Sequence, residues 1–272
     1  MIYRGETKFF SYYVDDCFPY IYIKVKPALG VSELKIISLS DAHIGARGFY
    51  EKKFLEYLKF IQSQPVLWYC AGDLFEMTIA GSRVSVFEQD LFPQEQLEYF
   101  YNKIKEAKIE DKMIFSQVGN HELRLINESS IDPMYWVQKS LGVADRHFRS
   151  PVYLTVEFGK GKFNFYSWHG SSSAQTVGGK INAASKPSGW ITNAHYFLMG
   201  HVHSSEVAPV VHQKLQLQNG RLVYKEFTQY IIISPAFYKY YKTYGATAGY
   251  RPPSTGAVVP YLYKNGTYGT SS

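Results

Sequence analysis

The first half of the chain alternates between short apolar runs and longer amphipathic segments. Three runs rich in β-branched and aromatic residues predict strands at 34–41, 65–73 and 113–120. Two segments between them carry apolar residues at three- and four-residue spacing, with charges opposite, at 50–63 and 93–108. The second segment also begins at Pro93, a residue favoured in the first turn of a helix. The pattern therefore predicts strand, helix, strand, helix, strand.

The second half predicts mainly strands. Apolar runs on either side of Gly159-Lys160-Gly161 predict one hairpin, and alternating residues on either side of Asn219-Gly220 predict another. Further apolar runs lie at 196–203 and 230–237. The residues from about Lys239 are Tyr, Gly, Thr and Pro without periodicity, which predicts an irregular cover or tail. The first thirty residues predict one or two short strands ahead of the core.

This order of elements favours an α/β fold in which two packed mixed sheets are flanked by helices, a layered α-β-β-α sandwich. The 272 residues contain no repeat and no long linker, so we expect one domain spanning 1–272. Its core is predicted at about 34–236, with the Tyr- and Gly-rich segment 237–272 as the cover.

Composition narrows the function classes only slightly. Hydrophobic residues make up 46% of the chain and charged residues 19%, which is globular composition. The aromatic fraction of 17% suits base stacking, but core packing is the favoured explanation. The net charge of +6 weakly favours anionic partners, because no dense Lys/Arg run accompanies it.

The cysteines and the apolar runs bear on location. Cys17 and Cys70 cannot build a disulfide framework, and Cys70 lies in an apolar run that predicts a buried thiol. The first residues lack the layout of a signal peptide, and no apolar run approaches transmembrane length. We therefore expect a cytoplasmic protein without a membrane partner.

Candidate chemistry gathers where five apolar runs end. Each run is followed directly by Asp, Asn or His: Asp41 and His43; Asp73; Asn120, His121 and Glu122; His169; His201 and His203. Strand ends at one edge of a sheet converge, and open α/β folds place their ligand sites there. Carboxylate, amide and imidazole together suit a divalent transition metal better than Ca or Mg. His121 alone could be a ligand, a catalytic acid or a structural histidine.

Local spacing supports a metal site. The pairs Asp41 and His43, and His201 and His203, are each two residues apart, so their side chains leave an extended backbone on the same face. Glycines border all five groups, which permits tight turns and close approach of the backbone to an anion: Gly45, Gly72, Gly119, Gly170 and Gly200.

The ordered series of groups, "SDAH", "GD", "GNHE", "WHG" and "GHVH", resembles the calcineurin-like metallophosphoesterase superfamily from Ile36 to about His203. The run from "SDAHIGA" to "GNHELR" is most similar to phage and archaeal-virus members related to DNA-repair exonucleases. The resemblance implies the metallophosphatase fold, and a location in the host cytoplasm if the protein is viral.

The resemblance also implies two metal ions. Asp41, His43, Asp73 and His203 would hold the first, and Asp73, Asn120, His169 and His201 the second, with Asp73 bridging. Manganese is the first expectation, with iron, zinc or nickel as alternatives. A hydroxide shared by the two ions would attack phosphorus in line with the leaving group.

By the same resemblance, His121 is a catalytic residue that acts as an acid or charge stabiliser and does not bind metal. Glu76 would orient His121 through its charge, although an ordinary supporting or surface carboxylate explains it nearly as well. Glu122 is expected to support the site from outside. Arg124 and Arg83 are candidates for phosphate contact or are solvated charges, while Met77 stands where related protein phosphatases have an arginine.

The remaining histidines, His147, His195 and His212, fit no group and are interpreted as structural or surface residues. The favoured function is a phosphodiesterase or nuclease acting on a phosphoester substrate, with DNA or RNA as candidates. The alternatives are a phosphomonoesterase and, less favoured, a non-catalytic binding module. The "GHVH" form and the basic charge favour the first. The sequence does not determine the oligomeric state, and a homodimer is one alternative.

Overall fold

The computed structural model describes residues 2–15, 17–82, 85–241, 246, 252–253 and 258–271. Strands in these residues form two mixed sheets. The eight-stranded sheet has the order β1 (Ile2–Glu6), β2 (Phe10–Asp15), β3 (Tyr20–Val25), β8 (Val152–Phe158), β9 (Gly161–Trp168), β10 (Tyr196–Met199), β12 (Arg221–Ile233) and β11 (Glu206–Gln218). The six-stranded sheet has the order β14 (Tyr268–Thr270), β13 (Pro260–Tyr263), β4 (Glu33–Ser38), β5 (Leu67–Cys70), β6 (Met113–Gln117) and β7 (His147–Phe148).

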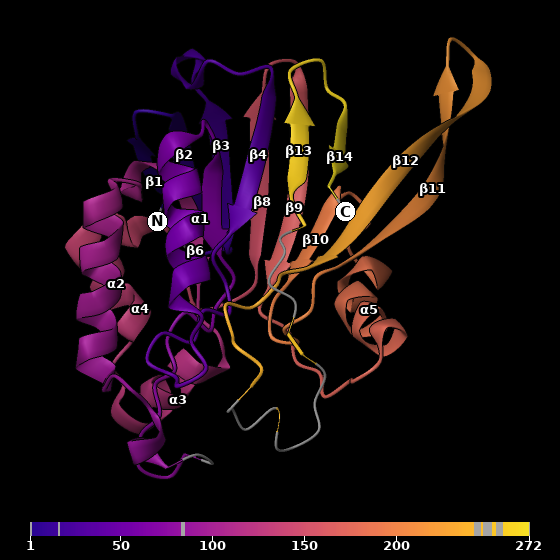
Figure 1. Ribbon diagram of the computed structural model, residues 1–272. Coiled ribbons are helices and arrows are strands. Elements are labelled where there is room, and N and C mark those ends of the chain that lie inside the picture. Colours follow the sequence, from indigo (N-terminus) through magenta and orange to yellow (C-terminus); the bar gives the residue numbers. More distant parts are fainter. Residues whose placement is uncertain are drawn as a thin grey trace.

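Helices lie on the outer side of each sheet, as Figure 1 shows. The described α-helices are α1 (Glu51–Ser63), α2 (Pro93–Ala107), α3 (Asn120–Ser129), α4 (Pro133–Leu141) and α5 (Val177–Ser185). Phe54 of α1 and Phe100 of α2 pack with Trp68 of β5, whereas Ala184 of α5 packs with Phe197 of β10. A separate apolar cluster fills the space between the two sheets. The predicted α/β class, with two mixed sheets and flanking helices, is confirmed.

The parallel strands β4, β5 and β6 determine where polar side chains collect. Their registers pair Ile36 with Leu67, and Trp68 with Met113. Every residue of β5 and β6 is buried because the other sheet covers one face and helices cover the other. The three strands therefore deliver their following loops to a single edge.

Both predicted hairpins are present. β8 and β9 pair antiparallel on either side of residues 159–160, and β11 and β12 pair antiparallel on either side of Asn219-Gly220. Asn219 and Gly220 have φ angles of 52° and 74°, the left-handed values that a two-residue hairpin turn requires. The second hairpin is long, with 13 residues in each strand.

The prediction of an irregular tail is wrong for residues 260–270. β13 pairs antiparallel with β4 through Leu262 and Leu34, and β14 pairs with β13. Leu262 is fully buried between the sheets. These strands have only four and three residues, too few for a period to show in the sequence, and they form because β4 leaves an edge open to pairing.

The predicted core limits of 34–236 are also too narrow at the N-terminus. Three strands precede Leu34, and β3 pairs in parallel with β8. Phe10, Ile21 and Ile23 are fully buried in the cluster between the sheets. The N-terminal strands therefore belong to the main sheet rather than preceding the core.

Residues 171–190, a small, polar and Gly-rich segment, contain α5. Thr176 caps this helix through its side chain, which accepts a hydrogen bond from the Gly179 backbone N–H. Two glycines weaken the intrinsic helical preference of this segment. Packing of Ala183 and Ala184 supplies what the local sequence lacks, because both side chains are buried.

The histidines interpreted as structural or surface residues include both kinds. His195 Nδ1 accepts a hydrogen bond from the Asn164 N–H, and burial lowers the pKa of this histidine to about 4. His212 lies exposed on β11. Cys17 is exposed, and Cys70 is buried as predicted. None of the helices in the described part of the chain combines the length and apolar character needed to cross a bilayer.

Asp132 anchors the start of α4 and should make stability depend on pH. Its carboxylate accepts hydrogen bonds from Tyr135 N–H, His147 and Arg149. Although burial opposes it, these partners lower the pKa of Asp132 to about 2. A lowered pKa stabilises the fold above about pH 4, and this contribution is lost as pH falls towards 2.

We therefore expect Asp132→Asn to lower the free energy of unfolding by about 1–2 kcal/mol at pH 7. Urea denaturation from pH 7 to pH 2 measures this difference, which should shrink below pH 4. A difference that stays constant to pH 2 would contradict the account.

Candidate metal centre

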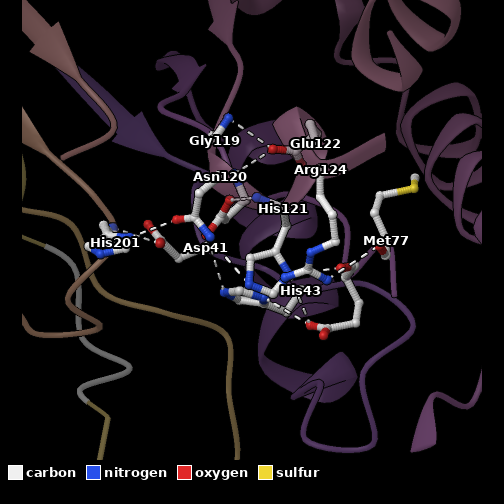
Figure 2. Close-up of polar contacts among 12 residues, drawn as sticks. Asp41, His43, Met77, Gly119, Asn120, His121, Glu122, Arg124 and His201 are labelled. Carbon is white, nitrogen blue, oxygen red and sulfur yellow. Dashed lines mark hydrogen bonds and ion pairs between the residues drawn. The ribbon is translucent and has the colours of Figure 1, made fainter. Parts of the chain in front are cut away.

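Loops from both sheets meet at one buried centre, shown in Figure 2. Asp41 and His43 follow β4, Asp73 follows β5, and Asn120 and His121 begin α3 directly after β6. The eight-stranded sheet contributes the rest: His169 after β9, then His201 and His203 after β10. The structure thus brings together all seven residues predicted to bind metal.

Asp41, His43 and His203 form the first donor group. One donor atom from each lies within 4.8 Å of the others. The Nε2 atoms of His43 and His203 are 3.0 Å apart, and His203 Nε2 is 3.7 Å from Asp41 Oδ1. Two nitrogens each bound at about 2.1 Å to one ion would have a similar separation.

Asp73, His169 and His201 form the second donor group, also within 4.8 Å. His169 Nε2 lies 3.1 Å from Asp73 Oδ2 and 3.0 Å from Asn120 Oδ1. His201 Nδ1 lies 2.8 Å from the same Asn120 oxygen. Asp73 Oδ2 is also 4.0 Å from His43 Nε2, so this carboxylate lies between the two groups.

The other ring nitrogen of two histidines fixes the direction of the donor atom. His43 Nδ1 donates to Glu76 Oε2 at 3.1 Å, and His169 Nδ1 donates to the Ala71 carbonyl at 2.8 Å. Their Nε2 atoms therefore face the centre. This arrangement, in which the second N–H binds a carboxylate or carbonyl, is usual for histidines that hold metal.

An unpaired carboxylate oxygen supports the same interpretation. Asp41 Oδ2 is buried and has no hydrogen-bond partner among the residues that the structure describes. A buried charged oxygen without a partner is costly, and a cation would satisfy it. The donor set of carboxylate, amide and imidazole fits divalent transition ions. The buried Asp and His clusters can hold metal ions.

Charges in the centre are strongly coupled. Burial, reinforced by the charge of Asp73, raises the pKa of Asp41 to about 7. Burial disfavours charge on His43 and His169, yet the neighbouring carboxylates raise their pKa values to about 9 and about 10. Positive imidazoles in turn hold the pKa of Asp73 well below its usual range despite burial. A bound cation would replace these protons, so metal binding should release protons.

Backbone conformation at the centre is unusual. Five of the donor residues have left-handed φ angles: Asp41 (52°), His43 (50°), Asp73 (49°), His201 (70°) and His203 (49°). Such conformations cost free energy in residues other than glycine, and they concentrate at functional sites, where the surrounding structure enforces them. The fold thus gives up stability to position these donors.

Glycines allow the chain to pass close to the carboxylates. A Cβ atom on Gly200 would lie 2.5 Å from Asp41 Oδ2. A Cβ atom on Gly119 would lie 2.2 Å from Asp73 Oδ1 and 2.3 Å from the Asp73 nitrogen. Because neither contact is sterically possible, a side chain at Gly119 must displace Asp73.

We expect Gly119→Ala to weaken metal binding at least tenfold while leaving the overall fold intact. Its φ of −99° suits alanine, so the effect would come from the collision with Asp73 alone. Calorimetric titration with Mn²⁺ measures the loss, and Gly178→Ala is the control because a Cβ atom at Gly178 meets open space. Unchanged affinity in Gly119→Ala would show that Asp73 does not bind the ion.

Glu122 supports the centre from behind, as expected. Its Oε2 accepts hydrogen bonds from the N–H groups of Asp73 and Gly119, and its Oε1 accepts one from Phe75. These bonds tie the loop after β5 to the start of α3. Burial, with the nearby Asp73 charge, raises the pKa of Glu122 to about 7.

His121 and Glu76 lie together, but not as the sequence predicted. The Glu76 carbonyl accepts from His121 Nδ1 at 2.7 Å, whereas the Glu76 carboxylate is 3.5 Å from that nitrogen and closer to His43. The backbone of Glu76 therefore orients His121, and its side chain orients His43. His121 Nε2 faces the centre, 4.0 Å from Asp73 Oδ2.

Of the two arginines expected at a phosphate, only Arg124 can be placed. It lies one turn along α3 from His121, and its Nη1 is 3.4 Å from the Met77 carbonyl. Figure 2 shows its guanidinium group beside the centre. Arg83 lies outside the described residues.

Tyr238 also lies at the centre, and the sequence analysis did not predict it. Its ring centroid lies 5.7 Å from that of His43 and 6.0 Å from that of His203. Burial and the charge of Glu76 raise its pKa to about 12, so the phenol keeps its proton. The apolar run at 230–237 could have signalled this position, because it too ends at a polar side chain.

Comparison of the chain with protein-family models and with curated proteins finds no match. The geometry of the centre therefore carries the functional argument.

Proposed function

We propose that this protein is a two-metal phosphoester hydrolase with the metallophosphatase fold of the calcineurin-like metallophosphoesterase superfamily. One observation carries the proposal: two compact donor groups from four strand ends, Asp41–His43–His203 and Asp73–His169–His201, meet at the Asp73 carboxylate. A single structural ion would need only one such group.

In this proposal Asp41, His43, Asp73 and His203 hold one ion, and Asp73, Asn120, His169 and His201 hold the other. The position of Asp73 Oδ2, 3.1 Å from His169 Nε2 and 4.0 Å from His43 Nε2, suits a bridging ligand. Manganese is the first candidate, and iron, zinc and nickel accept the same ligands.

Two bound divalent ions would supply an activated water and neutralise charge on the phosphoryl oxygens. The chain's own residues would do the rest. The Nδ1–H of His121 donates to the Glu76 carbonyl, so the ring carries a proton on Nε2 only as the imidazolium, and burial lowers the pKa of this histidine. In the imidazolium form, Nε2–H can protonate the leaving oxygen as a general acid. Arg124, one helical turn away, can pair with a non-bridging phosphate oxygen. Glu76 would keep the donor nitrogen of His43 directed at the ion.

For substrate, we propose a phosphodiester in nucleic acid or a nucleotide. The net charge of +6 and the His201-x-His203 pair, the form typical of phosphodiesterases in this superfamily, support this choice. A phosphodiester carries an alkoxide or nucleoside leaving group that benefits from protonation, which matches a histidine directed at the centre.

Hydrolysis of bis(p-nitrophenyl) phosphate and of p-nitrophenyl phosphate, both with added Mn²⁺, tests the proposal. We expect kcat/KM to be at least tenfold higher for the diester, and single-stranded DNA, duplex DNA and RNA should then be compared at several salt concentrations. Activity confined to the monoester would make the protein a phosphomonoesterase. Metal binding without any hydrolysis would indicate a binding module.

A further inference from the structure

Residues 210–229 form a two-stranded arm that leaves the body of the protein. In the arm β11 and β12 pair from Val210 with Gln229 to Gln218 with Arg221. The neighbouring strand β10 reaches β12 only at Tyr230. Figure 1 shows the arm projecting beyond both sheets. An isolated two-stranded ribbon is only marginally stable in water, so a further packing surface is expected.

The two faces of the arm differ in character. Residues paired across antiparallel strands point to the same face, and alternate residues point to opposite faces. One face therefore carries five large apolar side chains: Val211, Leu215, Leu217, Leu222 and Tyr224. The other carries three cations: Lys214, Arg221 and Lys225.

The apolar face continues the inner face of the eight-stranded sheet. Val207, Tyr230 and Ile232 lie on the same face of these strands and pack against the core between the sheets. Tyr268 of β14 is the last residue of the other sheet that covers this face, and its hydroxyl donates to the Thr228 carbonyl at 2.8 Å. Beyond Thr228 the inner face continues onto the arm without a second sheet above it in the described residues.

We infer that a second copy of this chain covers the apolar face, with two arms packed face to face about a two-fold axis. The five side chains are between 59% and 78% exposed. Together they offer roughly 600 Å² of apolar surface, close to the roughly 800 Å² that each partner buries in a standard interface. A self-complementary strip of this kind suits an isologous dimer.

The distribution of charge favours this partner over an anionic one. Stacking the apolar faces leaves Lys214, Arg221 and Lys225 outside, in solvent, with no like charges brought together. A nucleic acid would instead bind the cationic face and leave the apolar strip exposed. Glu226, paired with Gln213, is the one charged residue on the apolar face of the arm, near its base.

The dimer would leave the metal centre open. β10 and β12 run parallel, and β10 leads at its carboxyl end to His201 and His203. The arm residues of β12 come before Tyr230, at the amino end of the part of β12 that pairs with β10. Contacts made by the arm therefore lie at the end of the sheet away from the metal ligands, and the dimer does not depend on the proposed hydrolysis.

Sedimentation equilibrium of the 272-residue chain tests the inference, with two double variants of equal charge. Leu215→Glu/Leu217→Glu puts carboxylates on the apolar face, and Gln216→Glu/Gln218→Glu puts the same charges on the opposite face of the same strand. We expect the unmodified protein and the Gln variant to reach twice the 31.2 kDa monomer mass at micromolar concentration. The Leu variant should stay monomeric, with at least a hundredfold weaker association.

Far-UV circular dichroism and Mn²⁺ binding of the dilute Leu variant should match those of the unmodified protein, because its changes lie on an exposed ribbon. A monomeric unmodified protein, a dimeric Leu variant, or equal loss of the dimer in both variants would overturn the inference. Binding of a monomeric protein to lipid vesicles through the apolar face would also overturn it.

Discussion

Asp73→Ala should abolish both metal binding and hydrolysis. The Asp73 carboxylate lies between the two donor groups, and His121 N–H and His169 hold it in place. Without it each ion loses an anionic ligand, so we expect Mn²⁺ affinity to fall at least a hundredfold and turnover to fall below detection. Calorimetric titration and diester hydrolysis measure the two effects.

The fold should survive this change. Asp73 repels the buried carboxyl groups of Asp41 and Glu122, but the positive imidazoles of His169 and His121 stabilise its charge and hold its pKa well below the usual range despite burial. The melting temperature without metal should therefore fall slightly, while the increase on adding Mn²⁺ should vanish. Asp111→Ala, at an exposed position, is the control. Retention of two ions by Asp73→Ala would rule out the bridging role.

His121→Ala should separate metal binding from catalysis. His121 lies beside the centre, but the donor groups Asp41–His43–His203 and Asp73–His169–His201 are complete without it. We expect two bound ions and a kcat lower by about 10²–10⁴, the range for removal of a general acid, with little change in KM. Metal analysis and steady-state diester hydrolysis on the same preparation provide the measurements.

His212→Ala, at an exposed residue of β11, is the control and should keep full turnover. Because His121 also forms a group with His43 and Asp73 within 4.8 Å, loss of an ion from His121→Ala would show that it is a ligand. Unchanged kcat would remove His121 from the mechanism.

The sequence could predict the central sheet because each signal there is local. The strands β4, β5 and β6 are buried on both faces, so they appear as continuous apolar runs, and α1 and α2 appear as amphipathic segments. The donors could be predicted for the same reason. A polar residue directly after a buried strand is conspicuous, and parallel strands place such residues at one edge.

What the sequence left hidden depends on contacts between distant segments. β13 pairs with β4 across more than two hundred residues, and its few residues carry no period. The apolar run at 230–237 marks Tyr238 as a position to consider, but its contact with His43 and His203 depends on the distant bond from the Phe237 N–H to the Asp41 carbonyl. Loop geometry also determines whether His121 bonds the carboxylate or the carbonyl of Glu76, and the sequence does not show that geometry.

We propose that two ions share Asp73 in this centre. Electron paramagnetic resonance of the protein reconstituted with Mn²⁺, with metal content measured on the same sample, tests it most directly. Two ions about 4 Å apart are exchange-coupled. We expect two Mn²⁺ per chain with the spectrum of a coupled pair, and an uncoupled or absent signal in Asp73→Ala. One ion per chain, none, or two with independent spectra in the unmodified protein would contradict it.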